Sequence, residues 1–188
     1  MKRSVTKLLT ISLVVISLMS FVKPEKWFWL VSEEYGYKIE FPEEPVERPK
    51  VVNSEIGELK LNVFLYDASL RGKDDNLVYM VNYTEYPVDQ IHSNNTEILP
   101  DLFRNSVEGV VMNVNGELLS EEEIQLGQYP GREIRIDYKN GMAIISMRIY
   151  LVENKMYMIQ TITETKKEAK KSIDRFMDSF ELIGAGTN

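Results

Sequence analysis

Only a few side chains in this sequence have the type and spacing that catalysis or metal binding requires. His92 is the one histidine among the 188 residues, and it lies in a polar stretch, residues 88–97. A single imidazole has no second histidine with which to hold a metal ion. A Ser-His-Asp triad would have to use His92, and the sequence has no G-x-S-x-G nucleophile elbow. We therefore expect His92 to be a loop residue without a catalytic role.

The strongest cluster of carboxylates is the run Glu121–Glu123. It falls in a predicted strand, where neighbouring side chains point to opposite faces, so only Glu121 and Glu123 share a face. Such a pair can bind calcium or divide the acid and base roles of a hydrolase. Charged side chains on a solvated strand edge also oppose aggregation, and we prefer this interpretation.

Two further patterns could mark a calcium site or a phosphate-binding loop. Asp67, Asp74 and Asp75 are candidates for a loop calcium site, but their spacing matches no EF-hand. The segment GQYPG, residues 127–131, resembles a phosphate-binding loop, but the polar and apolar alternation of residues 132–138 predicts a strand rather than a helix after it. We interpret Gly127 and Gly131 as turn residues, with Pro130 fixing φ between them.

The composition excludes several classes of chemistry. The sequence has no cysteine, which excludes disulfides, thiolate catalysis and cysteine-based zinc sites. Its formal net charge is −7, and an acidic surface repels phosphate backbones, so nucleic acid is not expected as a partner. We predict no catalytic residue, no metal site and no cofactor.

The amino-terminal segment has the pattern of an export signal. Lys2, Arg3 and Lys7 precede an uncharged apolar run from Leu8 to Val22. This run is shorter than the about 20 residues that a bilayer span needs. We interpret residues 1–22 as a signal peptide that is cleaved, with an uncleaved anchor as the alternative. The sequence therefore predicts an exported protein of the periplasm or cell envelope.

The rest of the chain alternates between strand patterns and two helix patterns, which predicts an α+β fold with an antiparallel sheet flanked by helices. Residues 76–87 are apolar on both faces, which predicts a central strand that is covered on both sides. Two prolines make residues 43–52 an edge or irregular strand. Helices are predicted at 96–112, starting near Leu99, and at 164–180. The other predicted strands are residues 35–42, 54–68, 117–126, 132–138, 142–152 and 156–163.

Several of these segments resemble one family. YGYKIEFPEEPVE, NLVYMVNYTEYP, GELLSEEEIQLGQYPGREIRI, RIYLVENKMYMI and RFMDSFELI are similar to bacterial exported proteins of the PsbP-like and DcrB-like group. The resemblance covers residues 33–183 and implies a single domain with the PsbP-like α/β/α sandwich. It also implies a non-enzymatic accessory or binding protein, and none of the family's functional residues has a matching position in this sequence.

Aromatic residues crowd the start of the expected mature chain, and they are our candidate surface for a partner or ligand: Trp27, Phe28, Trp29, Tyr35 and Tyr37. Exposed aromatic side chains anchor interfaces. The alternative that we prefer is that this segment pairs with the sheet and buries its rings. A third possibility places the segment KWFWL at a membrane interface, where tryptophan is favoured.

These patterns together predict an envelope protein that acts by binding a partner. The expected partner is an envelope protein, and the alternatives are a carrier of a small hydrophobic ligand and a hydrolase that uses the paired carboxylates. We expect a monomer that touches the membrane only if the signal is retained. Residues 23–32 form an aromatic lead-in to the domain, and residues 184–188 form a tail.

Overall fold

The computed structural model describes residues 26–54, 56–70, 76–167 and 170–184. The predicted signal peptide, residues 1–22, lies outside the described residues. Within the described ranges, no helix is long and apolar enough to cross a membrane.

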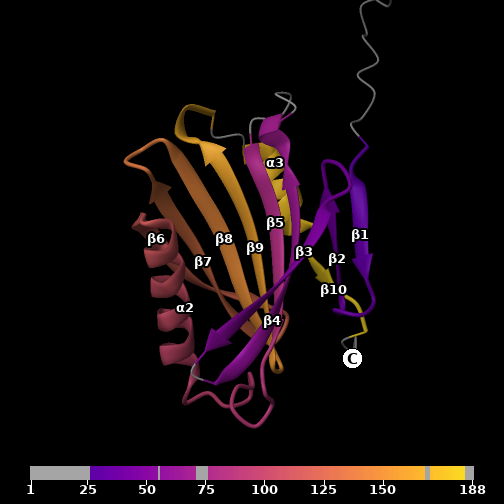
Figure 1. Cartoon of the computed structure of the whole chain (residues 1–188), viewed down its shortest axis with the longest axis vertical. Helices are drawn as coiled ribbons and strands as arrows, with labels where there is room; N and C mark the ends of the chain where they lie inside the picture. Colours follow the sequence, from indigo (N-terminus) through magenta and orange to yellow (C-terminus); the bar gives the residue numbers. More distant parts are fainter. Residues whose placement is uncertain (1–25, 55, 71–75, 168–169, 185–188) are drawn as a thin grey trace, which may run out of the picture.

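A seven-stranded antiparallel sheet forms the centre of the fold (Figure 1). Every pair of neighbouring strands in it is antiparallel. The spatial order is β3-β4-β5-β9-β8-β7-β6. The strands are β3 (Val46–Ser54), β4 (Gly57–Asp67), β5 (Asn76–Glu85), β6 (Glu117–Leu126), β7 (Tyr129–Tyr138), β8 (Ala143–Val152) and β9 (Lys155–Glu164).

Tight turns join most neighbouring strands of this sheet. Glu153 has φ of 55° in the two-residue turn between β8 and β9, and Lys139 and Asn140 have φ of 53° and 54° between β7 and β8. Positive φ at the turn positions matches the twist of the flanking strands in a hairpin. The predicted edge strand is confirmed, because β3 lies at the edge of the sheet and contains Pro49.

A second, three-stranded sheet is formed by the two ends of the described chain. Its order is β1 (Phe28–Ser32), β2 (Tyr37–Phe41) and β10 (Glu181–Leu182), with β2 in the centre. Alternate residues of β2 are fully buried, since Tyr37, Ile39 and Phe41 all have an exposed fraction of 0%. The segment expected as a lead-in therefore includes a strand of the folded domain.

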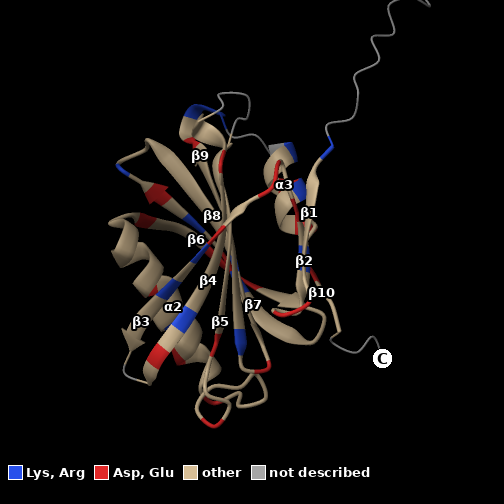
Figure 2. Ribbon diagram, turned by 45° about the vertical axis from the view of Figure 1, so that its right-hand side comes forward, with Lys and Arg blue, Asp and Glu red and all other residues tan. Residues whose placement is uncertain are grey.

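The helices lie on opposite faces of the large sheet. Helix α2 (Leu99–Val114) packs Phe103 and Val107 against β7 and β8. Helix α3 (Lys170–Asp178) packs against the other face together with the small sheet, and Figure 2 shows it beside β1 and β2. Both predicted helices are present, but the stretch before α3 is different from the prediction, because residues 165–167 form a 3₁₀ turn, η2 (Thr165–Lys167).

The two outer layers differ from the helical layers that the sequence implied. One consists of α2, and the other combines α3 with the three-stranded sheet. The α+β class is right, and the fold is richer in sheet than an α/β/α sandwich. The small sheet contributes to this layer because β2 buries three large apolar residues, Tyr37, Ile39 and Phe41, on one side.

The predicted turn at Gly131 is wrong, and the structure gives a different reason for the glycine. The turn consists of residues 127–128, with Gly127 at φ of 62°, and Pro130 and Gly131 already belong to β7. Gly131 lies directly opposite Tyr150 of β8. A Cβ atom at Gly131 would lie 2.5 Å from both the Ile149 carbonyl oxygen and Tyr150 Cδ1. Gly131 thus allows the Tyr150 ring to lie against the backbone.

We predict opposite effects for two glycine-to-alanine substitutions. Gly131→Ala forces a backbone or ring shift in a closely packed site, and we expect it to lower the free energy of unfolding by about 1–3 kcal/mol. Gly109→Ala is the matched control, because Gly109 lies within α2 with no atom within 4 Å of an added Cβ. We expect it to raise that free energy by up to about 1 kcal/mol. Urea unfolding measures both, and equal stability of the two variants would contradict the packing of Tyr150.

Candidate binding surface

The predicted aromatic surface is largely part of the core. Trp27 is 7% exposed, and its ring meets Tyr79 edge to face at 5.9 Å. Tyr35 stacks on Tyr83 at 4.8 Å, and Tyr37 contacts Tyr157 at 5.7 Å. The rings of these residues therefore bind the small sheet to the large one, as in our preferred interpretation.

Only Phe28 and Trp29 of the five candidates reach the surface, with exposed fractions of 36% and 44%. The Nζ atom of Lys38 lies 5.3 Å from the centre of the Trp29 ring, and it also forms an ion pair with Glu181 at 2.7 Å. Neighbouring strands of the same sheet thus hold this part of the aromatic segment. The candidate surface is reduced to these two side chains of β1.

The buried tyrosines have strongly shifted pKa values. Burial, together with the charge of Glu47, raises the pKa of Tyr35 from its usual 10 to about 12. Burial also raises the pKa values of Tyr37 and Tyr157, because a phenolate loses its hydration in the core. Tyr157 Oη donates a hydrogen bond to the Tyr35 carbonyl oxygen at 2.7 Å. Tyr37 Oη has no hydrogen-bond partner among the described residues.

The glutamate pair shares one face of β6, as the sequence predicts. Arg132 of β7 forms ion pairs with both carboxylates, at 3.3 Å to Glu121 and 2.8 Å to Glu123. The guanidinium carbon of Arg132 also lies 4.8 Å from the ring centre of Phe103 in α2. The pair is a set of counter-ions for this arginine at the sheet edge, and this arrangement does not support the hydrolase hypothesis.

The two remaining candidates are local structural residues where the structure describes them. His92 Nδ1 accepts a hydrogen bond from the Asn94 backbone N–H at 3.1 Å within the loop. Asp67 accepts hydrogen bonds from the backbone and hydroxyl of Ser69. Asp74 and Asp75 lie outside the described residues. Among those described, no group of three or more metal-binding side chains is found.

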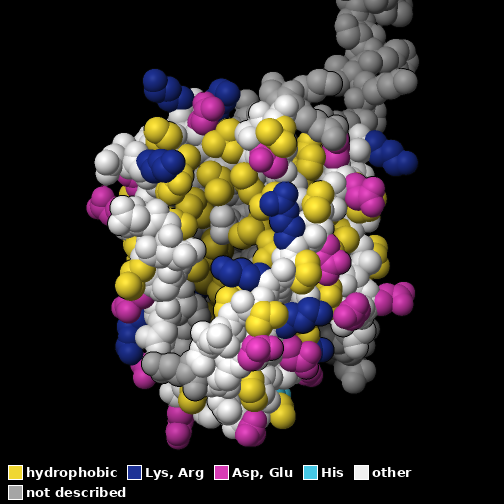
Figure 3. All heavy atoms as spheres, viewed as in Figure 1, with side chains coloured by type: hydrophobic (Ala, Val, Ile, Leu, Met, Phe, Trp, Pro, Cys, Tyr) yellow, Lys and Arg dark blue, Asp and Glu magenta, His cyan; other side chains and the backbone are white. Residues whose placement is uncertain are grey.

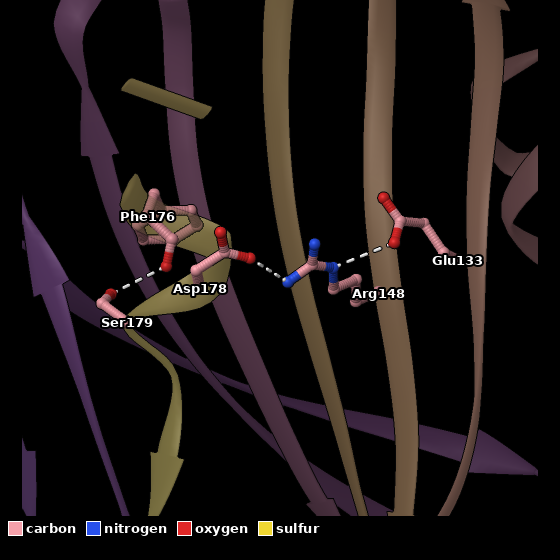
Figure 4. A network of polar contacts seen from close by, with 5 residues as sticks. All are labelled: Glu133, Arg148, Phe176, Asp178 and Ser179. Carbon is pink, nitrogen blue, oxygen red and sulfur yellow. Dashed lines mark hydrogen bonds and ion pairs between the residues drawn. The ribbon is translucent and has the colours of Figure 1, made fainter. Parts of the chain in front are cut away.

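A cleft of about 380 Å³ lies between α3 and strands β7 and β8. Arg148 lines this cleft: its Nε donates to Glu133 at 3.1 Å and its Nη1 donates to Asp178 at 2.8 Å (Figure 4). Burial alone would lower the pKa of Arg148, but the bond to Asp178 and the charge of Glu133 outweigh burial and raise it. Arg148 thus stays charged and ties the end of α3 to the sheet.

Ser179 continues this connection to the small sheet. Its hydroxyl donates to the Phe176 carbonyl oxygen at 2.8 Å and accepts the Glu40 backbone N–H at 2.9 Å. Arg175 adds two hydrogen bonds to the Glu40 carboxylate, at 2.7 and 3.0 Å. We interpret the charged cleft as the clamp that fixes α3, because its central ionic groups are already paired with one another.

The strongest candidate binding surface is found on the α2 side of the large sheet. Directly opposite residues of paired strands point to the same face, so the strand register defines rows of side chains across the sheet. The first row contains Arg48, Val63, Asn82, Met158, Ile149 and Arg132. The second row contains Val46, Leu65, Met80, Gln160, Met147 and Ile134.

Exposure increases along both rows with distance from α2. Ile149 and Ile134, beneath the helix, have exposed fractions of 0%. Val63, Leu65 and Met80 are half-buried, although they are apolar and lie in the interior of the sheet. We call this area the open face; it consists of the α2-side residues of β3, β4 and β5 with Met158 and Ile162 of β9.

The opposite side of β5 is closed. Tyr79 and Val81 of β5 have exposed fractions of 0%, whereas Met80 between them is half-buried on the open face. Figure 3 shows the open face as a hollow with a floor of hydrophobic side chains and with Lys and Arg side chains at its border. A cleft of about 680 Å³ adjoins it beside Ile162 and Leu77.

Sequence reasoning did not identify this surface. The apolar residues of β4 and the two apolar faces of β5 were the available signal, and they predicted a strand that is covered on both sides. The structure covers only one side of β5 with α3 and the small sheet. This prediction is wrong for the α2 side, because α2 lies over β7 and β8.

These features define an antiparallel α+β sandwich with one closed and one partly open sheet face. Among solved structures, the chain is similar to the solution structure of cyanobacterial PsbP (CyanoP) from Synechocystis sp. PCC 6803, with a TM-score of 0.53 and 14% sequence identity. The match covers 87% of this chain and 96% of that chain. The fold is therefore PsbP-like, as the sequence resemblance implied. No protein-family model matches the sequence, and no curated protein matches it.

We predict that two buried tyrosines respond differently to loss of the hydroxyl group. Tyr157→Phe removes a hydrogen bond to a backbone carbonyl, and we expect the free energy of unfolding at pH 7 to fall by about 1 kcal/mol. Tyr37→Phe removes a buried hydroxyl without a partner among the described residues, so we expect unchanged or higher stability. Urea unfolding with matched circular dichroism spectra tests this difference. A larger loss for Tyr37→Phe would contradict it.

The same measurement on the wild-type chain as a function of pH tests the buried phenols. A pKa that is raised on folding contributes stability that is complete below the unfolded value, here about pH 10. We expect the free energy of unfolding to fall as the pH rises from 10 to 12, the raised pKa of Tyr35. A flat profile over this range would contradict the burial of these rings.

Proposed function

We propose that this chain is an exported, non-enzymatic accessory protein of the bacterial envelope that binds a macromolecular partner through the open face. The observation that carries the proposal is the contrast between Met80 and its neighbour Val81, which are half-buried and fully buried. On the α2 side, β4 and β5 expose apolar side chains that no other element of the described chain covers. An exposed apolar surface of this kind marks a site of interaction with another macromolecule.

The likeness of the fold to CyanoP and of the sequence to exported PsbP-like and DcrB-like proteins supports the accessory role and the location. The basic and apolar pattern of residues 1–22 supports export. The pairing of Glu121 and Glu123 with Arg132 makes a carboxylate hydrolase the weaker proposal, since both groups serve as counter-ions.

A carrier of a small hydrophobic ligand is also less well supported. A carrier encloses most of its ligand's surface in a pocket. The space between the sheet and α3 is occupied by rings, with Tyr79 at 5.2 Å from Phe176 and Tyr37 at 5.5 Å from Phe180. The open face extends over three strands, which suits a macromolecule.

The test is native mass spectrometry of the mature protein after gentle purification from its own envelope. We expect a complex whose added mass corresponds to a protein partner in fixed stoichiometry. Met80→Glu should remove this partner, because a charge on the apolar floor loses its hydration on binding. Leu119→Glu is the control, since Leu119 is 50% exposed on β6, away from the open face.

Two outcomes would contradict the proposal. An added mass of small-molecule size would favour the carrier, and a bare chain from every preparation, with chemical crosslinking included, would exclude a stable or transient partner. The mass of the mature chain also tests cleavage of residues 1–22.

A further inference from the structure

We propose that the open face binds an acidic amphipathic helix of the partner protein, in the position beside α2. This inference rests on the proposed function and names the chemistry of its partner. It is supported by the space beside α2, by the charges at the border of the open face and by the mixed composition of its floor.

The space is sufficient for one more helix. Neighbouring strands are about 4.8 Å apart, and a helix with its side chains is about 10–12 Å wide, so one helix covers about two strands. Helix α2 covers β7 and β8, while β5, β4 and β3 continue the sheet beyond β9. By this spacing, these strands offer a strip that is wide enough for a second helix.

The charge at the border of the open face favours an acidic partner. Arg48 lies directly opposite Val63, and Lys50 directly opposite Leu61, so both cations point to the open face from the edge strand. Both are exposed, and no ion pair of either is found among the described residues. In a chain with net charge −7, two such cations next to an apolar floor are a local exception.

The carboxylates that share this side of β4 and β9 do not cancel these cations. Asp67 accepts hydrogen bonds from Ser69 at the end of β4. Glu164 pairs with Lys167 at 3.4 Å at the end of β9. The positive border formed by Arg48 and Lys50 therefore remains available to acidic side chains on a docked helix.

Addition of a partner strand to the sheet is less favourable than docking of a helix. The exposed edge of the sheet on this side is β3, and Pro49 in its centre has no N–H group to donate to an added strand. The flanking Arg48 and Lys50 also protect this edge against pairing. The face of the sheet, rather than its edge, is thus the surface on which a partner can bury apolar area.

The floor is better suited to a peptide than to a hydrocarbon chain. Asn82 and Gln160 lie in adjacent rows among the apolar residues. The side-chain oxygen of Asn82 is buried and accepts no hydrogen bond from the described residues, while its amide donates to the Met158 sulfur at 3.9 Å. Met80 and Met158 add flexible side chains that adapt to a helix surface.

The experiment is position-resolved photo-crosslinking of the full chain in the bacterium that produces it. The photoreactive residue p-benzoylphenylalanine replaces Val63, Leu65 or Met80 on the open face, and it replaces Val31 as the control. Val31 is 55% exposed on β1. We expect the three open-face positions to crosslink to one protein segment whose sequence is acidic and helically amphipathic, and the control position to give no such product. Circular dichroism of each purified variant confirms that it is folded.

A charge-reversal pair tests the recognition itself. We expect Arg48→Glu with Lys50→Glu to reduce the crosslinked product at least about tenfold, because it replaces attraction by repulsion. The matched control is Lys60→Glu with Lys171→Glu, which changes the net charge equally at exposed positions on β4 and α3. It should leave the yield unchanged.

The outcomes separate this inference from the proposed function. Crosslinks from Val31 but not from the open face would overturn the inference and leave an accessory protein with another surface. Crosslinks from the open face to lipid, to a basic segment or to a second copy of this chain would also overturn it. Absence of any product at all four positions would contradict both proposals.

Discussion

The cover of the seven-stranded sheet by the helices and the small sheet determines which of its apolar side chains are buried and which contact water. A seven-stranded sheet has two wide apolar faces, and within the described residues two helices and one small sheet are available to cover them. The small sheet and α3 close one face with a cluster of aromatic rings. Helix α2 covers only part of the other, which leaves the apolar side chains of β4 and β5 partly in contact with water.

The closed face is stabilised by residues from both ends of the chain. Trp27 and Tyr37 come from the start of the folded domain, and Phe176 and Phe180 come from its end, yet all four pack in one cluster. Arg148 joins α3 to the sheet through Asp178. These long-range contacts hold α3 and the small sheet on one side of the large sheet, so the cover that they provide is not available to the other side.

The sequence allowed much of the fold to be predicted, because strands and helices leave local periodic patterns. The stripe of Ile173, Phe176 and Met177 correctly predicted the buried side of α3, and Pro49 correctly predicted an irregular or edge strand. The candidate surface was not predictable in this way. A strand pattern shows that Met80 is on an apolar face, but whether another element covers that face depends on where α2 lies, which is a tertiary property.

The partners and the burial of the candidate site residues also depend on tertiary structure, which local sequence patterns do not reveal. The sequence correctly placed Glu121 and Glu123 on one face, but their partner Arg132 belongs to the next strand and is brought there by the register of β6 and β7. Trp27 and Trp29 are nearly adjacent and identical in type, yet one is buried and the other is exposed. Trp27 precedes β1, and its ring packs between Tyr79 and Arg175, whereas Trp29 lies within β1 beside Lys38.

The central claim, that β5 is closed on one face and open on the other, can be tested directly because the chain has no native cysteine. The measurement is the rate of thiol labelling of Met80→Cys and Val81→Cys, which are neighbours on β5 that point to opposite faces. The account predicts that the thiol at position 80 reacts at least about tenfold faster under native conditions, and that the two rates become equal in urea. Equal and strong protection of both thiols in the native protein would contradict the open face.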